Sequence, residues 1–389
     1  MIALIIRLFK KLKLNINLHN KASYDFKRFK LIPKEKRQIV FYAETRADWT
    51  FIGPVYDYLK KKNQDVVRIT SDISDLSLKE TNVFYIGNGN IRTIFFRTLN
   101  SKCLALTLTD LDTLYLKKSM YPVHYFYIFH SLISTHRSYR EHAFNGYSTI
   151  FCAGSYHVNE IRKTEEIYNL NKKKLEYCGY PRLDQLISEF NIYSSKKLNN
   201  KINKILIAPS WGPSSLTITQ IEDIVKNLLD NNFEVIVRLH PMTLNNDKNI
   251  KKKLLEKFNT KEKFYFDEKI DSMESFIISD FLISDWSGSS IEFAFTKLRP
   301  VFFIDTEPKK RNNNWSKLNI KCIEEEIRKD IGYIIPPNKL NTISNLINDS
   351  IDDLNLWKVK ISKTREQNIF NLNLSIKFAA EKIYNQIKS

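Results

Sequence analysis

Residues 281–304 have the sequence FLISDWSGSSIEFAFTKLRPVFFI, which predicts a strand, a turn of small residues, a helix and a second strand. The apolar runs at 281–284 and 300–304 are as short as buried strands usually are, and residues 289–298 have the pattern of a helix. Two strands joined through a helix lie parallel in one sheet, with the helix covering its face. This stretch therefore predicts an α/β fold built on parallel sheets.

The same alternation of strand and helix continues outward along the chain. Residues 191–203 are rich in Asn, Lys and Ser and are the best candidate for a linker, and the tail at 338–389 has the pattern of helices. We predict two Rossmann-like, doubly wound parallel-sheet domains that face a cleft, followed by C-terminal helices. The predicted units are a basic amphipathic N-terminal segment at 1–30, a first Rossmann-like domain at 31–190, and a second Rossmann-like domain with the helical tail at 204–389.

The composition narrows the class of protein. The 389 residues carry a net charge of +18, and a basic excess of this size attracts nucleic acid, anionic lipid or a phosphate-rich polymer. The sequence has no zinc-finger, helix-turn-helix or ribonucleoprotein motif, so nucleic acid is the less favoured partner. The four cysteines lack metal-ligand spacing and are expected to be reduced core thiols of a cytosolic protein.

The N-terminus concentrates the positive charge. Residues 1–37 carry eleven basic and two acidic side chains, which is half of the net charge in a tenth of the chain. The apolar stretch within residues 1–15 is too short to span a bilayer, and no secretory cleavage site follows it, so we expect a cytoplasmic protein on the inner face of the plasma membrane. A helix docked on the protein's own surface is the alternative to an anionic membrane interface, and the charge favours lipid. On a helix, an apolar face has Ile2, Ile5, Ile6, Phe9 and Leu12, and a basic face has Arg7, Lys10 and Lys11.

A candidate base follows the predicted strand at 123–129, before a helix expected at 135–144. Ligands of parallel sheets bind at the carboxyl ends of the strands, so His130 is expected to face the cleft. Its ordinary pKa of about 6.5 suits removal of a proton from an acceptor hydroxyl. A hydrogen-bonded structural histidine is the alternative interpretation.

Candidate phosphate ligands follow a predicted strand at 234–239, in the motif Arg238-Leu239-His240-Pro241. Side chains alternate along a strand, so Arg238 and His240 should point to the same side. A permanent cation beside a titratable one suits the binding of a diphosphate. We therefore predict that both side chains hold the donor phosphates.

The small-residue turn at 285–290 is a second candidate anion site, because N–H groups and hydroxyls at a helix N-terminus bind phosphate. Glu292 lies one short step into the helix and is placed to accept from ribose hydroxyls. Alternatively, Ser289 caps the helix with Glu292 as its capping-box partner, which is compatible with phosphate binding. The residues expected to hold phosphate here are Ser287, Gly288, Ser289 and Ser290.

Further cleft residues are predicted around the same strand ends. The first half ends in Gly-Tyr-Pro-Arg at 179–182, where Arg182 either reaches the cleft or pairs with Asp184 in a rigid turn. For Trp211, packing is the alternative to ligand binding. No metal-ligand spacing or Gly-x-Gly-x-x-Gly motif is present, so no bound metal or cofactor is expected. The residues expected to line the nucleotide site are Pro209, Ser210, Trp211, Asp285 and Glu292.

Taken together and in this order, the segments between about Phe129 and Asp305 resemble the CDP-glycerol:poly(glycerophosphate) glycerophosphotransferase family, which makes teichoic-acid-like and capsular polymers. The usual His-Gly of that family is His130-Ser131 here, and Trp286 stands where Tyr is common. The motifs that carry the resemblance are Phe-His-Ser (129–131), Gly-Tyr-Pro-Arg-Leu-Asp (179–184), Ala-Pro-Ser-Trp (208–211), Arg-Leu-His-Pro (238–241) and Ser-Asp-Trp-Ser-Gly-Ser-Ser (284–290).

The resemblance implies a GT-B fold and transfer of glycerol phosphate, or a related alditol phosphate, from a CDP-alditol to a polymer or lipid-linked acceptor, with release of CMP. It places the proposed base on His130, a phosphate-binding histidine on His240 and diphosphate-binding serines on 287, 289 and 290. It also implies no metal in the cleft and peripheral membrane binding. A glycosyltransferase that uses a nucleotide sugar, in capsule or lipopolysaccharide synthesis, and a non-enzymatic polyanion-binding protein are the alternatives.

Overall fold

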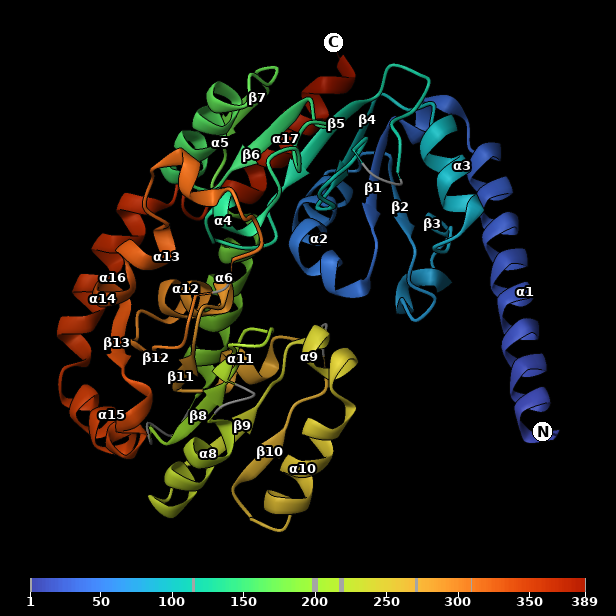
Figure 1. Cartoon of the computed structure of the whole chain (residues 1–389). Coiled ribbons are helices and arrows are strands. Elements are labelled where there is room, and N and C mark those ends of the chain that lie inside the picture. Colours follow the sequence, from blue (N-terminus) through green and yellow to red (C-terminus); the bar gives the residue numbers. More distant parts are fainter. Residues whose placement is uncertain are drawn as a thin grey trace.

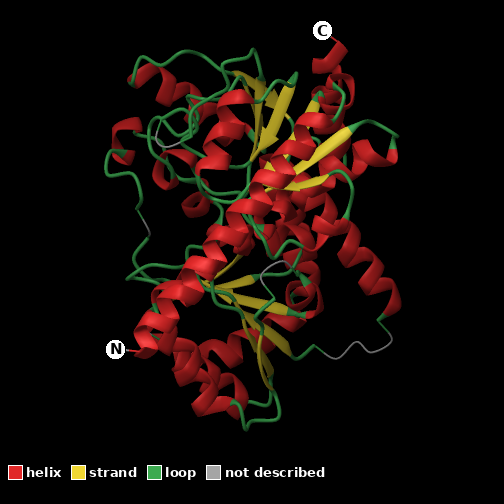
Figure 2. Ribbon diagram, turned by 90° about the vertical axis from the view of Figure 1, so that its right-hand side faces the viewer, coloured by secondary structure: helices red, strands yellow, loops and turns green. Residues whose placement is uncertain are grey.

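The computed structural model describes residues 2–113, 116–197, 202–216, 220–269, 272–308 and 310–388, apart from the side chains of residues 2–13 and 248. Within these ranges the chain forms two parallel β-sheets with helices packed on both faces of each (Figure 1). Figure 2 shows the two sheets from the side, one above the other. The predicted α/β class, with two Rossmann-like domains and C-terminal helices, is confirmed.

The first sheet has the strand order β3-β2-β1-β4-β5-β6-β7, and all of its pairs are parallel. Ile39 of β1 pairs with Val66 of β2 on one side and with Cys103 of β4 on the other. The strand order reverses between β1 and β4, which creates a topological switch point where ligands bind in such sheets. The strands are β1 Ile39–Ala43, β2 Val66–Thr70, β3 Val83–Tyr85, β4 Cys103–Leu106, β5 His124–Ile128, β6 Thr149–Cys152 and β7 Lys174–Tyr177.

The second sheet repeats this plan in the order β10-β9-β8-β11-β12-β13, again with parallel pairs. Ile205 of β8 pairs with Val235 of β9 and with Phe281 of β11, so its switch point lies between β8 and β11. Every side chain of β11 is buried, as expected of a strand covered on both faces. The strands are β8 Lys204–Ile207, β9 Glu234–Val237, β10 Phe264–Phe266, β11 Phe281–Ser284, β12 Val301–Ile304 and β13 Gly332–Ile335.

The helices cover these sheets and differ from the prediction in two places. The helix expected at 135–144 is a single turn, because the side chains of this segment bind neighbouring elements, and α6 extends to Lys196 through much of the predicted linker. The helices of the first half are α1 Ile2–Leu31, α2 Arg46–Lys61, α3 Asn90–Thr98, α4 Thr135–Ser138, α5 Ser155–Ile167 and α6 Pro181–Lys196. Those of the second half are α8 Ile221–Asp230, α9 Pro241–Asn246, α10 Lys248–Phe258, α11 Glu274–Ile278, α12 Gly288–Lys297, α13 Ile323–Glu326, α14 Arg328–Ile331, α15 Ile343–Asp352, α16 Leu354–Asn368 and α17 Ser375–Lys388. Short 3-10 turns lie at Lys34–Arg37, Leu76–Lys79, Trp315–Leu318 and Pro337–Thr342.

Two helices tie the halves together. α6 contacts α2 of the first half as well as α11 and α12 of the second. α17 returns to the first sheet, where Ala379, Ala380 and Ile383 join the core formed by β1 and α2. Gly179 permits this return, because its φ is +87° and a Cβ there would collide with the carbonyl oxygen of Phe370. The tail predicted to belong to the second domain therefore ends on the first one. The other predicted boundaries stay a prediction.

The N-terminal helix α1 runs along the outer side of the first sheet (Figure 1). Its described part packs through Ala22, Phe26 and Phe29 against α3 and β3. The apolar and basic faces predicted for residues 2–12 lie outside the described side chains. In the part of the chain that the structure describes, no helix combines the length and the hydropathy that crossing a membrane requires.

Candidate functional site

His130 lies two residues after β5, and hydroxyl groups hold its imidazole. Nδ1 is 2.9 Å from Thr107 Oγ1 and 3.2 Å from Tyr127 OH, and Nε2 is 3.3 Å from Tyr139 OH. Burial, and then the charge of Arg311, lowers the pKa of His130 to about 4, against a hydrogen bond to Thr107 that raises it. The imidazole is therefore neutral near pH 7 and has a lone pair for a proton.

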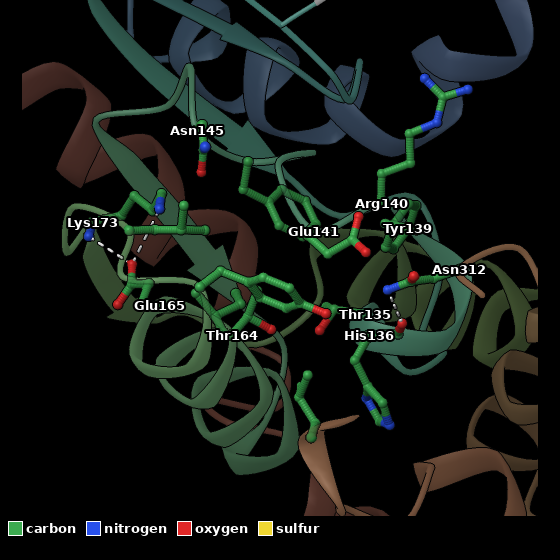
Figure 3. A pocket seen from close by; sticks show the side chains of 15 residues that line it. Thr135, His136, Tyr139, Arg140, Glu141, Asn145, Thr164, Glu165, Lys173 and Asn312 are labelled. Carbon is green, nitrogen blue, oxygen red and sulfur yellow. Dashed lines mark hydrogen bonds and ion pairs between the residues drawn. The ribbon is translucent and has the colours of Figure 1, made fainter. Parts of the chain in front are cut away.

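The loop after His130 is fixed by groups from both halves. Glu160 of α5 accepts hydrogen bonds from the Thr135 N–H at 2.6 Å and from its hydroxyl at 2.7 Å. From the second half, Glu324 accepts from the Ser134 N–H at 2.9 Å. A small cavity of about 20 Å³ lies beside this loop. Figure 3 shows side chains that line it, among them Asn312, which donates to the His136 carbonyl at 2.9 Å. These bonds explain why the segment does not continue as a helix.

His157 of α5 is a supporting residue that the sequence did not reveal. Its Nδ1 accepts from the Ala153 N–H at 3.3 Å, and its Nε2 donates to the Ile133 carbonyl at 3.1 Å. Its ring stacks on Phe129 with 3.8 Å between centroids, and burial lowers the pKa of His157 to about 3. A neutral, fully bonded imidazole thus supports the loop that carries His130. Nothing in the local sequence distinguishes it from an ordinary helical histidine.

The serine-rich turn meets the His130 loop directly. A Cβ on Gly288 would lie within van der Waals distance of Ser131 Oγ, so the lack of a side chain at 288 lets the two loops approach closely. Ser287 caps α12 by accepting from the Ser289 N–H at 3.4 Å, which makes the predicted Ser289–Glu292 capping box wrong. Ser290 is buried and donates to the Ser287 carbonyl, so its hydroxyl points inward and does not face a ligand as predicted. The partly exposed hydroxyls of the turn are those of Ser287 and Ser289.

Asp285 organises the neighbouring loop and does not face a ligand as predicted. It is 1% exposed, and its two oxygens accept from the Ser210 N–H at 2.7 Å and the Leu216 N–H at 2.9 Å. Pro209 and Ser210 are also buried. Of the predicted loop 209–211, Trp211 is the residue whose side chain is partly exposed. Asp285 therefore positions Trp211 through the backbone of its loop.

Glu292 and Arg182 form a polar contact between the halves. Glu292 accepts from Tyr180 OH at 2.6 Å, and its other oxygen lies 3.8 Å from Arg182 Nε. Arg182 also donates to the Thr50 carbonyl at 3.1 Å, while Asp184 accepts from the Asn373 N–H. Burial raises the pKa of Glu292. Both carboxylate oxygens therefore face protein groups instead of a ribose, and the alternative pairing of Arg182 with Asp184 is also wrong.

The two side chains predicted to hold phosphate together have different neighbours. Arg238 donates to Asp267 Oδ2 at 3.2 Å and to Ser275 Oγ at 3.3 Å, which ties β9 to α11. His240 caps α9, with its Nδ1 accepting from the Met242 N–H at 3.0 Å, so a neutral ring carries its proton on Nε2. These two contacts hold Arg238 against α11, and its role in holding phosphate stays a prediction.

Arg311 is the cation that the sequence reasoning missed. Its guanidinium lies 4.9 Å from the centroid of the Trp211 ring, which in turn lies 5.9 Å from the His240 ring. Its charge also acts on His130 and Tyr139, so it stands between the two predicted histidines. The Arg311 N–H donates to the Arg137 carbonyl at 3.1 Å, which fixes its backbone to the loop after His130. Within the described ranges, no group of three or more His, Cys, Asp or Glu side chains is arranged to hold a metal ion.

The segment that contains these features matches a known family. Residues 126–313 match the model described as CDP-Glycerol:Poly(glycerophosphate) glycerophosphotransferase, a range that includes His130, the serine turn and Arg311. The match covers just under half of the chain, so over this segment the chain is similar to the family. A teichoic acid poly(glycerol phosphate) polymerase of Bacillus spizizenii is 31% identical over 148 residues, 34% of this chain and 35% of the relative. The match thus spans about a third of the length of this curated relative.

Solved structures share the fold of this chain. A variant of the wall teichoic acid polymerase TagF superposes with a TM-score of 0.63 at 13% identity, covering 100% of this chain and 98% of that chain. A UDP-GlcNAc 2-epimerase from Neisseria meningitidis gives a TM-score of 0.58 at 13% identity, covering 90% of this chain and 100% of that chain. At these identities the likeness shows the fold, which is GT-B-like.

Proposed function

We propose that this chain transfers glycerol phosphate, or a related alditol phosphate, from a CDP-activated donor to a hydroxyl of a cell-surface polymer and releases CMP. The observation that carries this proposal is the contact between Gly288 and Ser131, which places the neutral imidazole loop of one half against the helix N-terminus of the other. The family match supports the same chemistry. A solved TagF structure soaked with CDP-glycerol supports the identity of the donor.

His130 acts as the general base in this proposal. A hydrogen bond from Nδ1–H to Thr107 leaves the lone pair on Nε2, which removes the proton of the acceptor hydroxyl. The acceptor oxygen then attacks the β-phosphorus in line. The bond from that phosphorus to the bridging oxygen breaks, and CMP leaves with the electron pair. A base of this kind contributes roughly 10²- to 10⁴-fold to the rate.

Groups of the second half stabilise the leaving phosphate in this proposal. Arg311 supplies a permanent charge next to Trp211, and Nε2–H of His240 supplies a donor on the other side of that ring. Ser287, Ser289 and the N–H groups at the start of α12 add a helix-terminal anion site. Positioned donors and cations of this type are the main source of catalysis in phosphoryl transfer.

We also propose that the first half holds the acceptor and that α1 rests on the anionic inner face of the plasma membrane. The eleven basic side chains of residues 1–37 support this placement. Co-sedimentation with vesicles that contain phosphatidylglycerol is expected, and it should be lost when residues 1–13 are deleted. Equal sedimentation with uncharged vesicles would contradict an electrostatic membrane contact.

Incubation with a panel of activated donors tests the function. CDP-glycerol, CDP-ribitol and common nucleotide sugars are each mixed with a polymer acceptor, and the released nucleotide is measured. We expect CMP from a CDP-alditol. Release of a nucleoside diphosphate from a nucleotide sugar would show glycosyl transfer instead. No release from any donor would favour a polyanion-binding protein.

A further inference from the structure

A cavity of about 160 Å³ opens beside His130 at the switch point of the first sheet. It lies where β1 and β4 end, which is where sheets of this topology bind ligands. A cavity of about 150 Å³ is known to hold a benzene-sized molecule, so this one has room for a small polyol. Its lining residues are Tyr42, Glu44, Asp48, Thr107, Leu108, Thr109 and His130.

The lining is rich in hydrogen-bond acceptors and negative charge. Glu44 and Asp48 contribute carboxylates, and Thr107 and Thr109 contribute hydroxyls. Asp48 also caps α2, with one oxygen accepting from the Thr45 N–H at 2.8 Å, so its position is fixed. Within the described ranges no Lys or Arg side chain lines the cavity. Such a lining suits hydroxyl donors and repels a phosphate group.

The charge of one carboxylate is partly balanced from outside the cavity. Arg92 of α3 binds Glu44 and also lies 3.2 Å from Asn88 Oδ1. Glu44 is thus oriented by an ion pair and keeps lone pairs for a second donor. Burial raises the pKa of Asp48, the other carboxylate. Two oriented carboxylates next to a base form a polar cavity that is already shaped for hydroxyl groups.

We propose that this cavity binds the last, uncharged polyol unit of the acceptor, and that Glu44 and Asp48 select a free hydroxyl end over a phosphorylated one. The proposal rests on the proposed function. The polyol end occupies the cavity, its hydroxyls donate to the two carboxylates, and the reacting hydroxyl lies beside His130. The phosphodiester that joins this unit to the chain stays outside. Glu44 is a specificity-determining residue, because it contacts the acceptor without taking part in proton transfer.

The test uses two synthetic glycerol phosphate trimers, one that ends in free glycerol and one whose terminal unit carries a phosphomonoester. The wild-type protein is expected to use the free trimer as acceptor. The phosphorylated trimer should act only as an inhibitor, with an inhibition constant at least about tenfold higher than the dissociation constant of the free trimer. In Glu44→Gln, the KM for the free trimer should rise about tenfold while the KM for CDP-glycerol stays unchanged, because one charged hydrogen bond to the acceptor is lost. Glu44→Gln should also show a weaker preference for the free trimer over the phosphorylated one.

Two further variants keep the result interpretable. Glu80→Gln changes an exposed glutamate that pairs with Lys60 on the same domain, and it should leave both KM values unchanged. Thr109→Val removes a lining hydroxyl without touching the Glu44–Arg92 pair, so it tests the cavity if Glu44→Gln does not fold; we expect a smaller rise in the acceptor KM.

The outcomes separate the cavity from the proposed function. Equal inhibition by both trimers, or a change in the donor KM alone in Glu44→Gln, would overturn the cavity proposal while CMP release from the wild type persists. If the wild type releases no CMP from CDP-glycerol, the proposed function fails. Calorimetric binding of the two trimers to the wild type and Glu44→Gln then decides whether the cavity selects the free polyol end.

Discussion

His130 and His240 both follow a buried parallel strand, yet their surroundings differ. His130 is held by hydroxyls from β5 and its neighbours, and burial with the charge of Arg311 lowers its pKa to about 4. His240 makes a local contact, in which Nδ1 caps a short helix and Nε2 keeps the proton. The first imidazole is arranged to accept a proton and the second to donate a hydrogen bond. Two histidines that each follow a parallel strand thus have different hydrogen-bond partners, and we propose different roles for them.

Removing the base should give the largest effect. His130→Gln is expected to lower CMP release from CDP-glycerol by about 10²- to 10⁴-fold with folding retained, because amide groups do not accept the proton. Circular dichroism checks the fold. The control His142→Gln changes an exposed histidine in the same half and should keep full activity. Comparable rates in both variants would remove His130 from the chemistry.

Removing the Arg311 guanidinium should have the next largest effect on turnover. Arg311→Ala is expected to lower turnover about a hundredfold through the lost stabilisation of the leaving phosphate. The guanidinium also lowers the pKa of His130, so its loss should raise that pKa above about 4 and move the acid limb of the pH–rate profile to higher pH.

Two variants control the Arg311 experiment. Arg311→Lys retains the charge and should keep the acid limb near its wild-type position. Lys310 is the adjacent residue in the same loop, and Lys310→Ala should change neither the turnover nor the acid limb of the pH–rate profile. An unshifted acid limb in Arg311→Ala would show that this charge does not reach His130.

The contact between the two regions can be broken and restored. Gly288→Ala places a methyl group against Ser131 Oγ and is expected to reduce turnover about tenfold by forcing the loops apart. The double variant Gly288→Ala with Ser131→Gly removes the clashing atoms and should recover much of the activity. Failure of the second change to help would mean that the clash lies elsewhere. Steady-state kinetics on the three proteins measure this directly.

The smallest expected effect is on acid stability. The pKa of His157 is about 3 in the folded protein and about 6.5 in an unfolded chain. Its contribution to the free energy of unfolding is therefore complete above pH 6.5 and is lost as the pH falls toward 3. His157→Gln should lose about 2–4 °C less in Tm than the wild type between pH 7 and pH 4. An identical loss in both proteins would show that His157 does not titrate on unfolding.

The positions of the strand ends could be predicted from the sequence, because buried parallel strands have a clear apolar pattern and their carboxyl ends share one edge of the sheet. The serine turn does meet the His130 loop, as the contact between Gly288 and Ser131 shows, and His240 lies near Trp211. That these groups form one site stays a prediction. Asp285 and Glu292 were misassigned because a position in a turn or helix does not reveal which neighbour its carboxylate faces. Arg311 lies in a loop without periodicity, and its importance arises from tertiary placement. The return of α17 to the first sheet is likewise invisible in the local sequence.

The most direct test of the proposed reaction is a crystal structure of the inactive His130→Gln variant with CDP-glycerol bound. We expect the pyrophosphate to lie within about 3 Å of Arg311 and of Nε2 of His240, with the β-phosphorus facing residue 130. A pyrophosphate bound away from Arg311 and the start of α12, or a β-phosphorus turned away from the His130 loop, would contradict the proposed reaction.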